Sequence, residues 1–151
     1  MFGATGIKGD GSRIEVSKTS RVPFYSREAR FVVLRHEMPA ESERATHWDF
    51  MLQTPHGLRT WALAAEPAAG GRIAAEALAD HREEYLTFEG PVSGGRGTVE
   101  RWDAGSFRWQ RDEENEIVLQ LAGDRLRGRA YLARQPGSDQ RWWFFFFAEP
   151  I

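Results

Sequence analysis

The chain alternates between apolar and polar positions in short runs, which is the pattern of β-strands. From residue 30 onward, runs rich in Val, Phe, Trp and Leu are separated by Gly, Pro, Asp and Ser at intervals of about 8–12 residues, with no visible repeat period. This pattern predicts an all-β domain with minor short helices, either a barrel or a sandwich. We favour a closed or nearly closed antiparallel β-barrel, because closure removes the exposed edges of such an aromatic-rich sheet.

Eight of these runs are expected to form strands. In the run HWDFMLQ, Trp48, Phe50 and Leu52 lie on one side, which should face the core. The turn TPHG at residues 54–57 should join this run to the next one as a hairpin. The last run, RWWFFFF, is apolar on both faces, which predicts a closing strand covered on either side, with aromatic side chains that serve the core rather than a platform for stacking bases. The expected strands cover residues 31–35, 47–53, 58–63, 98–102, 106–109, 116–121, 126–134 and 141–147.

The segment at residues 70–88 gives conflicting signals. Its centre, AAEALADHREEYL, favours helix while its flanks favour strand, and we expect a short helix or helical turn around residues 81–85. The glycine-rich stretch GPVSGGRG at residues 90–97 lacks the Lys and hydroxyl that a phosphate-binding loop needs after its last glycine, so we expect a structural turn. Further turns are expected at residues 103–105, 111–115 and 123–125.

Length and composition restrict the possible function classes. At 151 residues the chain fits one domain, for which we expect a flexible arm over residues 1–29 and a globular domain over residues 30–151. The absence of Cys excludes disulfides, Cys-ligated metals and cysteine nucleophiles, and it fits the cytoplasm. No apolar run is long enough to cross a membrane. With 20 basic and 22 acidic residues the chain is no polycation, so any contact with nucleic acid must be local.

His47 and Asp49 are the first pair of residues whose spacing suggests chemistry. Two residues apart on a strand, their side chains project from the same face and could converge on one cation. His36, just past the preceding apolar run, is the candidate third ligand. Two imidazoles and one carboxylate, with positions left open for water or phosphate oxygens, favour Mn²⁺ or a similar divalent ion over a closed structural zinc site. The alternative is a hydrogen-bonded surface pair, a common role for an isolated His-x-Asp on a strand.

His81 and Tyr85 form a second candidate pair. On a helix they would lie one above the other and present an imidazole and a phenol to the same point. The imidazole titrates near neutral pH and can donate a proton to a leaving oxygen, while the phenol can hydrogen-bond a phosphate. The alternative is a histidine in an acidic surface helix, beside Asp80, Glu83 and Glu84.

Five sequence landmarks occur in order along the chain. They are FVVLRHE, HWDFMLQ, LRTWAL, the run DHREEYLTFEGPVSGGRGTVERWDAGSF, and LRGRAYLAR followed by RWWFF. Together, over about residues 30–147, they resemble the 3'-phosphoesterase domain attached to the bacterial DNA ligases of non-homologous end joining, usually called ligase D, and found also as a free-standing protein. The strand H-x-D-F and the run from Asp80 through Asp103 are the most specific of these stretches.

This resemblance implies a fold, a reaction and a set of site residues. The fold is a β-barrel with its active site in a groove on the outer surface. The reaction is a Mn²⁺-dependent repair of DNA 3' ends, in which a terminal ribonucleoside and then the remaining 3'-phosphate are removed to leave a 3'-hydroxyl. The implied partners are DNA or RNA–DNA 3' ends and a DNA ligase or other end-joining protein, with the chain itself a monomer. By position, the resemblance implies metal ligation by His36, His47 and Asp49, catalysis by His81 with Tyr85 beside it, and a phosphate contact by Arg72.

The chain also departs from the family pattern. Met51 stands where the pattern has a phosphate-binding Arg, and Ala65 stands where it has a Lys. Arg35, Arg44 or Arg59 could substitute in space, because all three flank the expected site in the sequence. Two hypotheses follow: a divergent phosphoesterase acting on 3' ends of nucleic acid, or a catalytically weak or inactive barrel that keeps the metal pocket and binds DNA ends or a repair partner.

Overall fold

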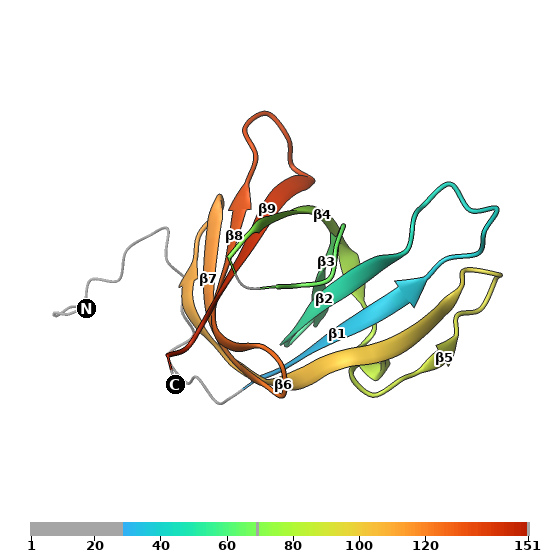
Figure 1. The fold of residues 1–151 in the computed structure, drawn as a ribbon, viewed down its shortest axis with the longest axis horizontal. Coiled ribbons are helices and arrows are strands. Elements are labelled where there is room, and N and C mark those ends of the chain that lie inside the picture. The colour runs from blue at the N-terminus through green and yellow to red at the C-terminus, as the bar shows by residue number, and fades with distance from the viewer. Residues whose placement is uncertain (1–28, 69, 151) are drawn as a thin grey trace, which may run out of the picture.

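The computed structural model describes residues 29–68 and 70–150, which form nine strands and one short 3₁₀ helix (Figure 1). The expected arm at residues 1–29 falls outside the described residues except for Ala29, which already belongs to the first strand. The described part of the chain contains no helix with the length and apolar character needed to cross a membrane. The elements are β1 (Ala29–Glu37), β2 (His47–Thr54), β3 (Gly57–Leu63), β4 (Arg72–His81), η1 (Glu83–Leu86), β5 (Gly90–Pro91), β6 (Thr98–Asp112), β7 (Glu116–Gly123), β8 (Arg127–Arg134) and β9 (Arg141–Ala148).

The strands close into an antiparallel barrel, as predicted. Eight of them follow the order β1-β2-β3-β4-β9-β8-β7-β6, and β6 pairs back with β1 to complete the circle. The short β5 pairs with the beginning of β6 and stands outside this closure. Figure 1 shows β1, β2 and β6 reaching beyond the barrel wall toward the hairpin loop that joins β1 to β2. Closure leaves no long unpaired edge on the sheet.

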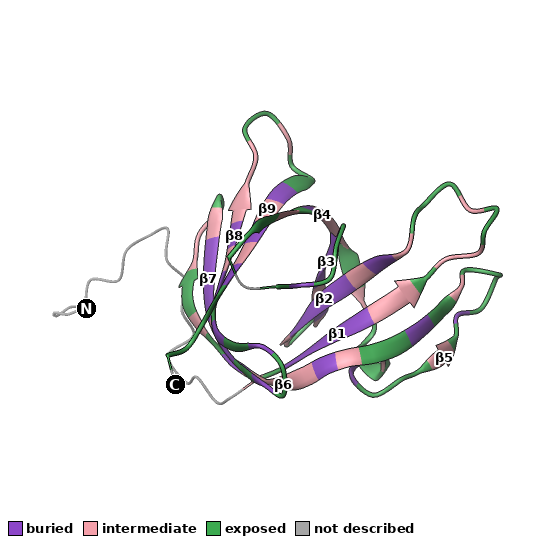
Figure 2. Ribbon diagram, viewed as in Figure 1, coloured by how far each residue is buried: buried purple, intermediate pink, exposed green. Residues whose placement is uncertain are grey.

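Alternation along β2 decides which side chains fill the barrel. Phe50 and Leu52 are fully buried in the main core, and Trp48 packs against it. Figure 2 shows that most of β2 is buried. The predicted inward face of this strand is therefore confirmed. Because neighbouring residues of a strand project to opposite faces, His47 and Asp49 project from the outer face.

A second apolar cluster lies on that outer face. Met51 is 1% exposed and packs there with residues of β1, β3, β6, η1 and the loop after β5. Met51, which stands where the family pattern has a phosphate-binding Arg, is thus enclosed by apolar side chains. The full cluster consists of Val32, Leu34, Met51, Leu58, Leu86, Val92 and Val99, with Tyr85 and Ala104 packed against it.

The helix expected around residues 81–85 is wrong in its first part. Residues 72–81 form β4, which pairs with β3 on one side and β9 on the other. The helical turn begins at Glu83 and ends at Leu86. The local preference of AAEALADH for helix is outweighed by backbone hydrogen bonds to two neighbouring strands, an effect that a local pattern does not reveal.

The break expected at residues 103–105 is also wrong, because β6 continues through it for 15 residues. The carboxylate of Asp103 accepts hydrogen bonds from the backbone N–H groups of Asp124, Arg125 and Leu126, at 2.8–3.0 Å. Gly105 is required because a Cβ there would collide with the backbone of β7. Asp103 and Gly105, which are typical of turns, therefore hold β6 against β7 and the turn that follows it, and they do not end the strand.

One face of the closing strand β9 is buried in the core, and its other face is only partly covered. Trp142, Phe144 and Phe146 are buried in the main core, as expected. The alternate residues point outward, and Phe147 is 51% exposed. The expectation that this strand is covered on both sides is therefore wrong at its end.

Asp103→Ala tests the role of this buried carboxylate. The substitution leaves three backbone N–H groups without their acceptor, and we expect the free energy of unfolding to fall by about 3 kcal/mol. Chemical denaturation followed by tryptophan fluorescence measures the change. Asp124→Ala, at an exposed position of the same turn, should change stability by less than about 0.5 kcal/mol. Equal stability of both variants would contradict this account of β6.

Met51→Arg tests the second cluster. An arginine at this buried position would place a charge among apolar side chains, so we expect the free energy of unfolding to fall by at least about 2 kcal/mol. Met51→Leu, which conserves volume and apolarity, should cost less than about 1.5 kcal/mol. Thermal denaturation of the two variants side by side makes the comparison, and an arginine variant as stable as wild type would show that the cluster is open.

Candidate metal centre

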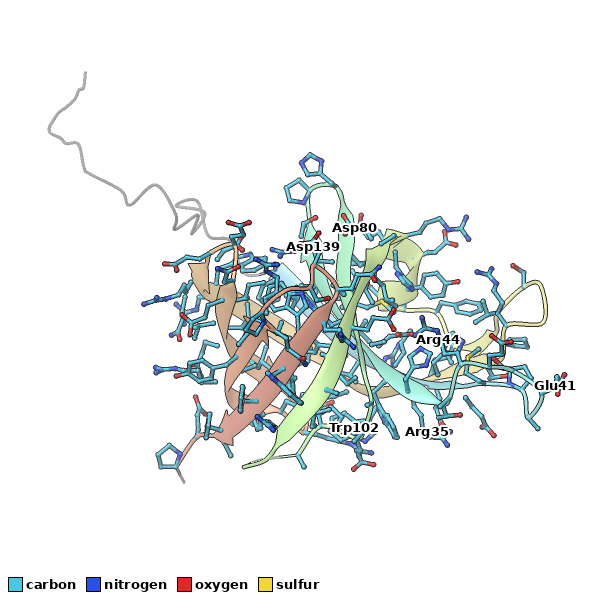
Figure 3. The ribbon with its side chains drawn as sticks, turned by 90° about the horizontal axis from the view of Figure 1, so that it is seen from above. Arg35, Glu41, Arg44, Asp80, Trp102 and Asp139 are labelled. Atoms are coloured by element: carbon cyan, nitrogen blue, oxygen red, sulfur yellow. The ribbon has the colours of Figure 1, made fainter. Side chains whose placement is uncertain are left out.

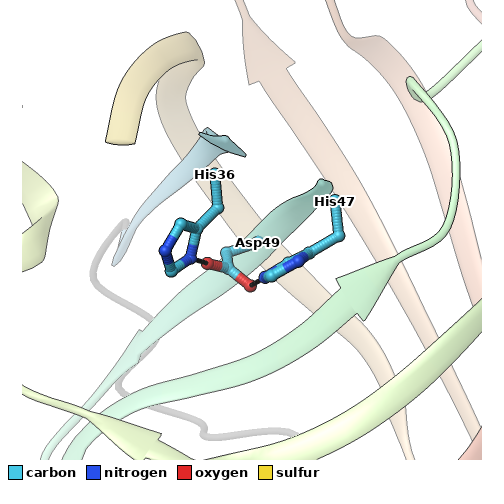
Figure 4. Close-up of side chains that lie close together, drawn as sticks. All are labelled: His36, His47 and Asp49. Atoms are coloured by element: carbon cyan, nitrogen blue, oxygen red, sulfur yellow. Dashed lines mark hydrogen bonds and ion pairs between the residues drawn. The ribbon is translucent and has the colours of Figure 1, made fainter. Parts of the chain in front are cut away.

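Three side chains from β1 and β2 meet on the outer face of the barrel (Figure 4). His36 lies near the end of β1 and pairs directly with His47, the first residue of β2, while Asp49 follows two residues later. One ligand atom from each of these residues lies within 4.8 Å of the other two. The three residues, called the trio below, are those in which the spacing predicted a metal site, and the structure brings them together.

Each imidazole of the trio uses one ring nitrogen to donate to a backbone carbonyl. Nε2 of His36 lies 2.6 Å from the carbonyl oxygen of Arg96, and Nδ1 of His47 lies 2.9 Å from that of Ala45. Because a carbonyl oxygen can only accept, both of these nitrogens carry a proton. The remaining nitrogens, Nδ1 of His36 and Nε2 of His47, both face the carboxylate of Asp49.

The Asp49 carboxylate lies between the two rings and is 2% exposed. Its Oδ2 is 3.1 Å from Nδ1 of His36, and its Oδ1 is 3.1 Å from Nε2 of His47. The second contact lacks the geometry of a hydrogen bond, so Oδ1 is a buried oxygen without a hydrogen-bond partner among the described residues. Burial disfavours the charged form of Asp49, but the interactions with His36 and His47 outweigh it and lower the pKa of Asp49 to about 2.

The pKa of His36 shifts in the opposite direction. The hydrogen bond with Asp49 raises it above 6.5 and prevails over burial, which alone would lower it. A positive charge on the ring is therefore favoured where the ring nitrogen faces the carboxylate. The same position would accommodate a metal cation.

The trio fits a divalent cation. Two ring nitrogens and one carboxylate oxygen converge, and each imidazole has its other nitrogen fixed by a carbonyl, which is the usual support of a metal-bound histidine. The orphaned Oδ1 of Asp49 is the kind of buried oxygen that a cation would satisfy. Three protein ligands leave coordination positions for water or substrate.

The structure places His81 and Tyr85 together, and no contact among the described residues joins them to the trio. Their rings are 5.8 Å apart and nearly perpendicular, although His81 ends β4 and Tyr85 lies in η1, so no shared helix is needed. His81 pairs with Leu58, which pairs with Gln53 near the end of β2. Met51 lies between Asp49 and Gln53 on the outer face and belongs to the second apolar cluster, and Tyr85 packs against the same cluster.

Three of the arginines expected to contact phosphate have other partners in the structure. Arg72 lays its guanidinium over the ring of Trp143, 4.1 Å from the ring centre, and no described contact links it to the trio. Arg35 lies over Trp48, and Arg59 pairs with Asp112. Ala65 is exposed in the turn after β3.

The backbone carbonyls of Arg96 and Ala45 support the site but could not be found from the sequence. A carbonyl leaves no residue signature, and Arg96 lies 60 positions from His36. One signal was available in the glycine-rich loop: a Cβ at Gly97 would collide with the carbonyl oxygen of Glu37, so only glycine allows this loop to close against the end of β1. The glycine-rich loop, which the sequence predicted to be only a structural turn, therefore supports His36.

Comparison with known proteins shows the family of the chain. The sequence profile described as "DNA Ligase D 3'-phosphoesterase domain" matches residues 36–134. The chain is 31% identical over 121 residues to the "Multifunctional non-homologous end joining DNA repair protein LigD" of Mycobacterium tuberculosis, covering 74% of this chain and 15% of that protein. It is 29% identical over 123 residues to the "Multifunctional non-homologous end joining protein LigD" of Pseudomonas aeruginosa, covering 73% of this chain and 14% of that protein.

These relatives are much longer than the matched region. A third, from Mycolicibacterium smegmatis, is 26% identical over 147 residues, which cover 86% of this chain and 18% of that protein. The chain thus spans less than a fifth of the length of the relatives it matches. The profile match nevertheless covers both the trio and the pair His81 and Tyr85, as well as most strands of the barrel. The chain therefore belongs to the DNA ligase D 3'-phosphoesterase domain family.

Proposed function

We propose that this barrel is a divalent-metal-dependent phosphoesterase that acts at 3' ends of nucleic acid during DNA end joining, with Mn²⁺ as its ion. Family membership and the LigD relatives support a role in the repair of 3' ends. Removal of a 3'-phosphate or of a terminal ribonucleotide is the specific activity proposed, with a DNA ligase or another end-joining protein as partner.

The convergence of two imidazoles on the buried carboxylate of Asp49 is the observation that carries the proposal. With both rings neutral, the nitrogens that face Asp49 would carry no proton, and the carboxylate would lack a compensating positive charge. A bound divalent cation would supply that charge, polarise a phosphate oxygen and reduce the negative charge that develops on the phosphate.

The remaining chemistry is assigned to His81 and Tyr85. Nδ1 of His81 donates to the carbonyl oxygen of Ala79 at 3.0 Å, which leaves Nε2 as the nitrogen that exchanges a proton with substrate. The ring of Tyr85 packs edge-on against that of His81 and fixes its orientation. We assign His81 as the group that donates a proton to the leaving oxygen, with Tyr85 as its positioning residue.

A second function is favoured by one specific observation. Met51 is buried in apolar surroundings where the family pattern has a phosphate-binding arginine, so one cationic contact is absent. Loss of one preorganised donor typically costs about 2.7–4 kcal/mol of transition-state stabilisation. The alternative is a barrel that holds the metal and binds DNA ends with little or no turnover.

Metal binding is tested by titration calorimetry of chelator-treated protein with Mn²⁺. We expect one site in the wild type and at least tenfold weaker binding in Asp49→Asn, because the substitution removes the trio's single negative charge while keeping its shape. His56→Ala, at an exposed histidine in the turn after β2, should bind like wild type. Equal affinity in all three proteins would refute the metal assignment.

Turnover is tested with a DNA strand ending in a 3'-phosphate or a single ribonucleotide, in the presence of Mn²⁺. The wild type should release product, and His81→Ala should lower kcat at least a hundredfold while its Mn²⁺ affinity stays within twofold, because His81 is assigned to the leaving oxygen. Gel analysis of the 3' end and phosphate release measure this. If the wild type binds DNA ends but releases no product, the phosphoesterase hypothesis is refuted in favour of the DNA-end-binding barrel.

A further inference from the structure

A row of cross-strand neighbours connects the trio to β4 on the outer face. Asp49 of β2 is the register partner of Ala62 of β3, and Ala62 is the partner of Glu76 of β4. Adjacent strands are about 4.8 Å apart, so the backbones at Asp49 and Glu76 are roughly 10 Å apart. Since the residue between them is an alanine, no large side chain rises from the sheet between the two carboxylates.

Arg44 pairs with the residue at the β4 end of this row. It belongs to the loop that joins β1 to β2, whose base is fixed by a hydrogen bond from the N–H of Met38 to Oγ1 of Thr46. Its guanidinium pairs with Oε1 of Glu76 at 3.2 Å, with both side chains about two-fifths exposed. Figure 3 shows Arg44 and Arg35 on opposite sides of the ribbon formed by β1 and β2, so the two arginines serve different faces.

Arg44 therefore stands at the Glu76 end of this row, and the trio stands at the Asp49 end. An anion located over Ala62 would lie between the trio on one side and a guanidinium on the other.

We propose that Arg44 is the residue that binds the substrate phosphate beside the trio, and that Glu76 holds it in place until substrate arrives. This inference rests on the proposed function and names a binding residue for it. An exposed ion pair contributes little free energy, so a phosphate can replace Glu76 as the partner of Arg44. Arg141, the register partner of Glu76 on β9, remains beside the released carboxylate and limits the cost of the exchange.

The test uses inorganic phosphate and the full chain loaded with Mn²⁺. Bound Mn²⁺ broadens the ³¹P resonance of a phosphate held close to it, so the broadening reports phosphate at the trio without any turnover. We expect Arg44→Ala to raise the dissociation constant for phosphate at least tenfold and Arg44→Lys to restore part of the affinity, because the charge returns without the planar fork. Glu76→Gln should lower the constant about threefold, because it removes the carboxylate that competes with phosphate.

A second ion pair provides the matched control. Arg111 and Glu116 are also 3.2 Å apart and similarly exposed, on the hairpin of β6 and β7. Arg111→Ala and Glu116→Gln should leave phosphate binding and Mn²⁺ affinity unchanged. Phosphate binding that is equal in Arg44→Ala and wild type, with Mn²⁺ bound normally in both, overturns this inference and leaves the proposed function standing. A wild type that binds no Mn²⁺ overturns both.

Discussion

The buried carboxylate of Asp49, enclosed by two imidazoles, is the interaction on which the candidate site depends. A carboxylate this deeply buried is stable only with compensating positive charge or hydrogen bonds. The carbonyls of Arg96 and Ala45 occupy one nitrogen of each ring, so the compensation must come from the nitrogens that face Asp49. A proton on His36 would provide it in the metal-free protein, and a divalent cation bound in the same place would have to displace that proton.

The barrel makes this geometry possible by bringing distant segments to one point. β1 pairs with both β2 and β6, so the end of β1 lies beside the start of each strand. His36 therefore meets His47 across one ladder and meets the loop that precedes β6 across the other. The loop approaches closely because Gly97 has no side chain. Closure of the sheet and construction of the site are consequences of the same pairings.

The sequence predicted what depends on strand periodicity and failed where distant pairing decides. His47 and Asp49 could be predicted because the two-residue alternation of a strand places them on one face. His36 could be added because it directly follows the preceding apolar run. The segment AAEALADH could not, because its helix preference is local while its strand conformation comes from β3 and β9. Asp103 and Gly105 look like a turn in the sequence, and their real role depends on backbone groups some twenty residues away. Backbone carbonyls that orient histidines leave no trace in a sequence.

The two sides of the trio differ in physical character, and this difference gives the site a direction. Toward the end of β2 lies the apolar cluster around Met51, which excludes water and strengthens electrostatic interactions at its border. Toward β4 lies the buried Ala62, and beyond it the pair of Arg44 and Glu76, whose charged side chains are about two-fifths exposed. Under the proposed function, a phosphate at the trio would find the guanidinium of Arg44 on the β4 side and the hydrocarbon around Met51 along β2.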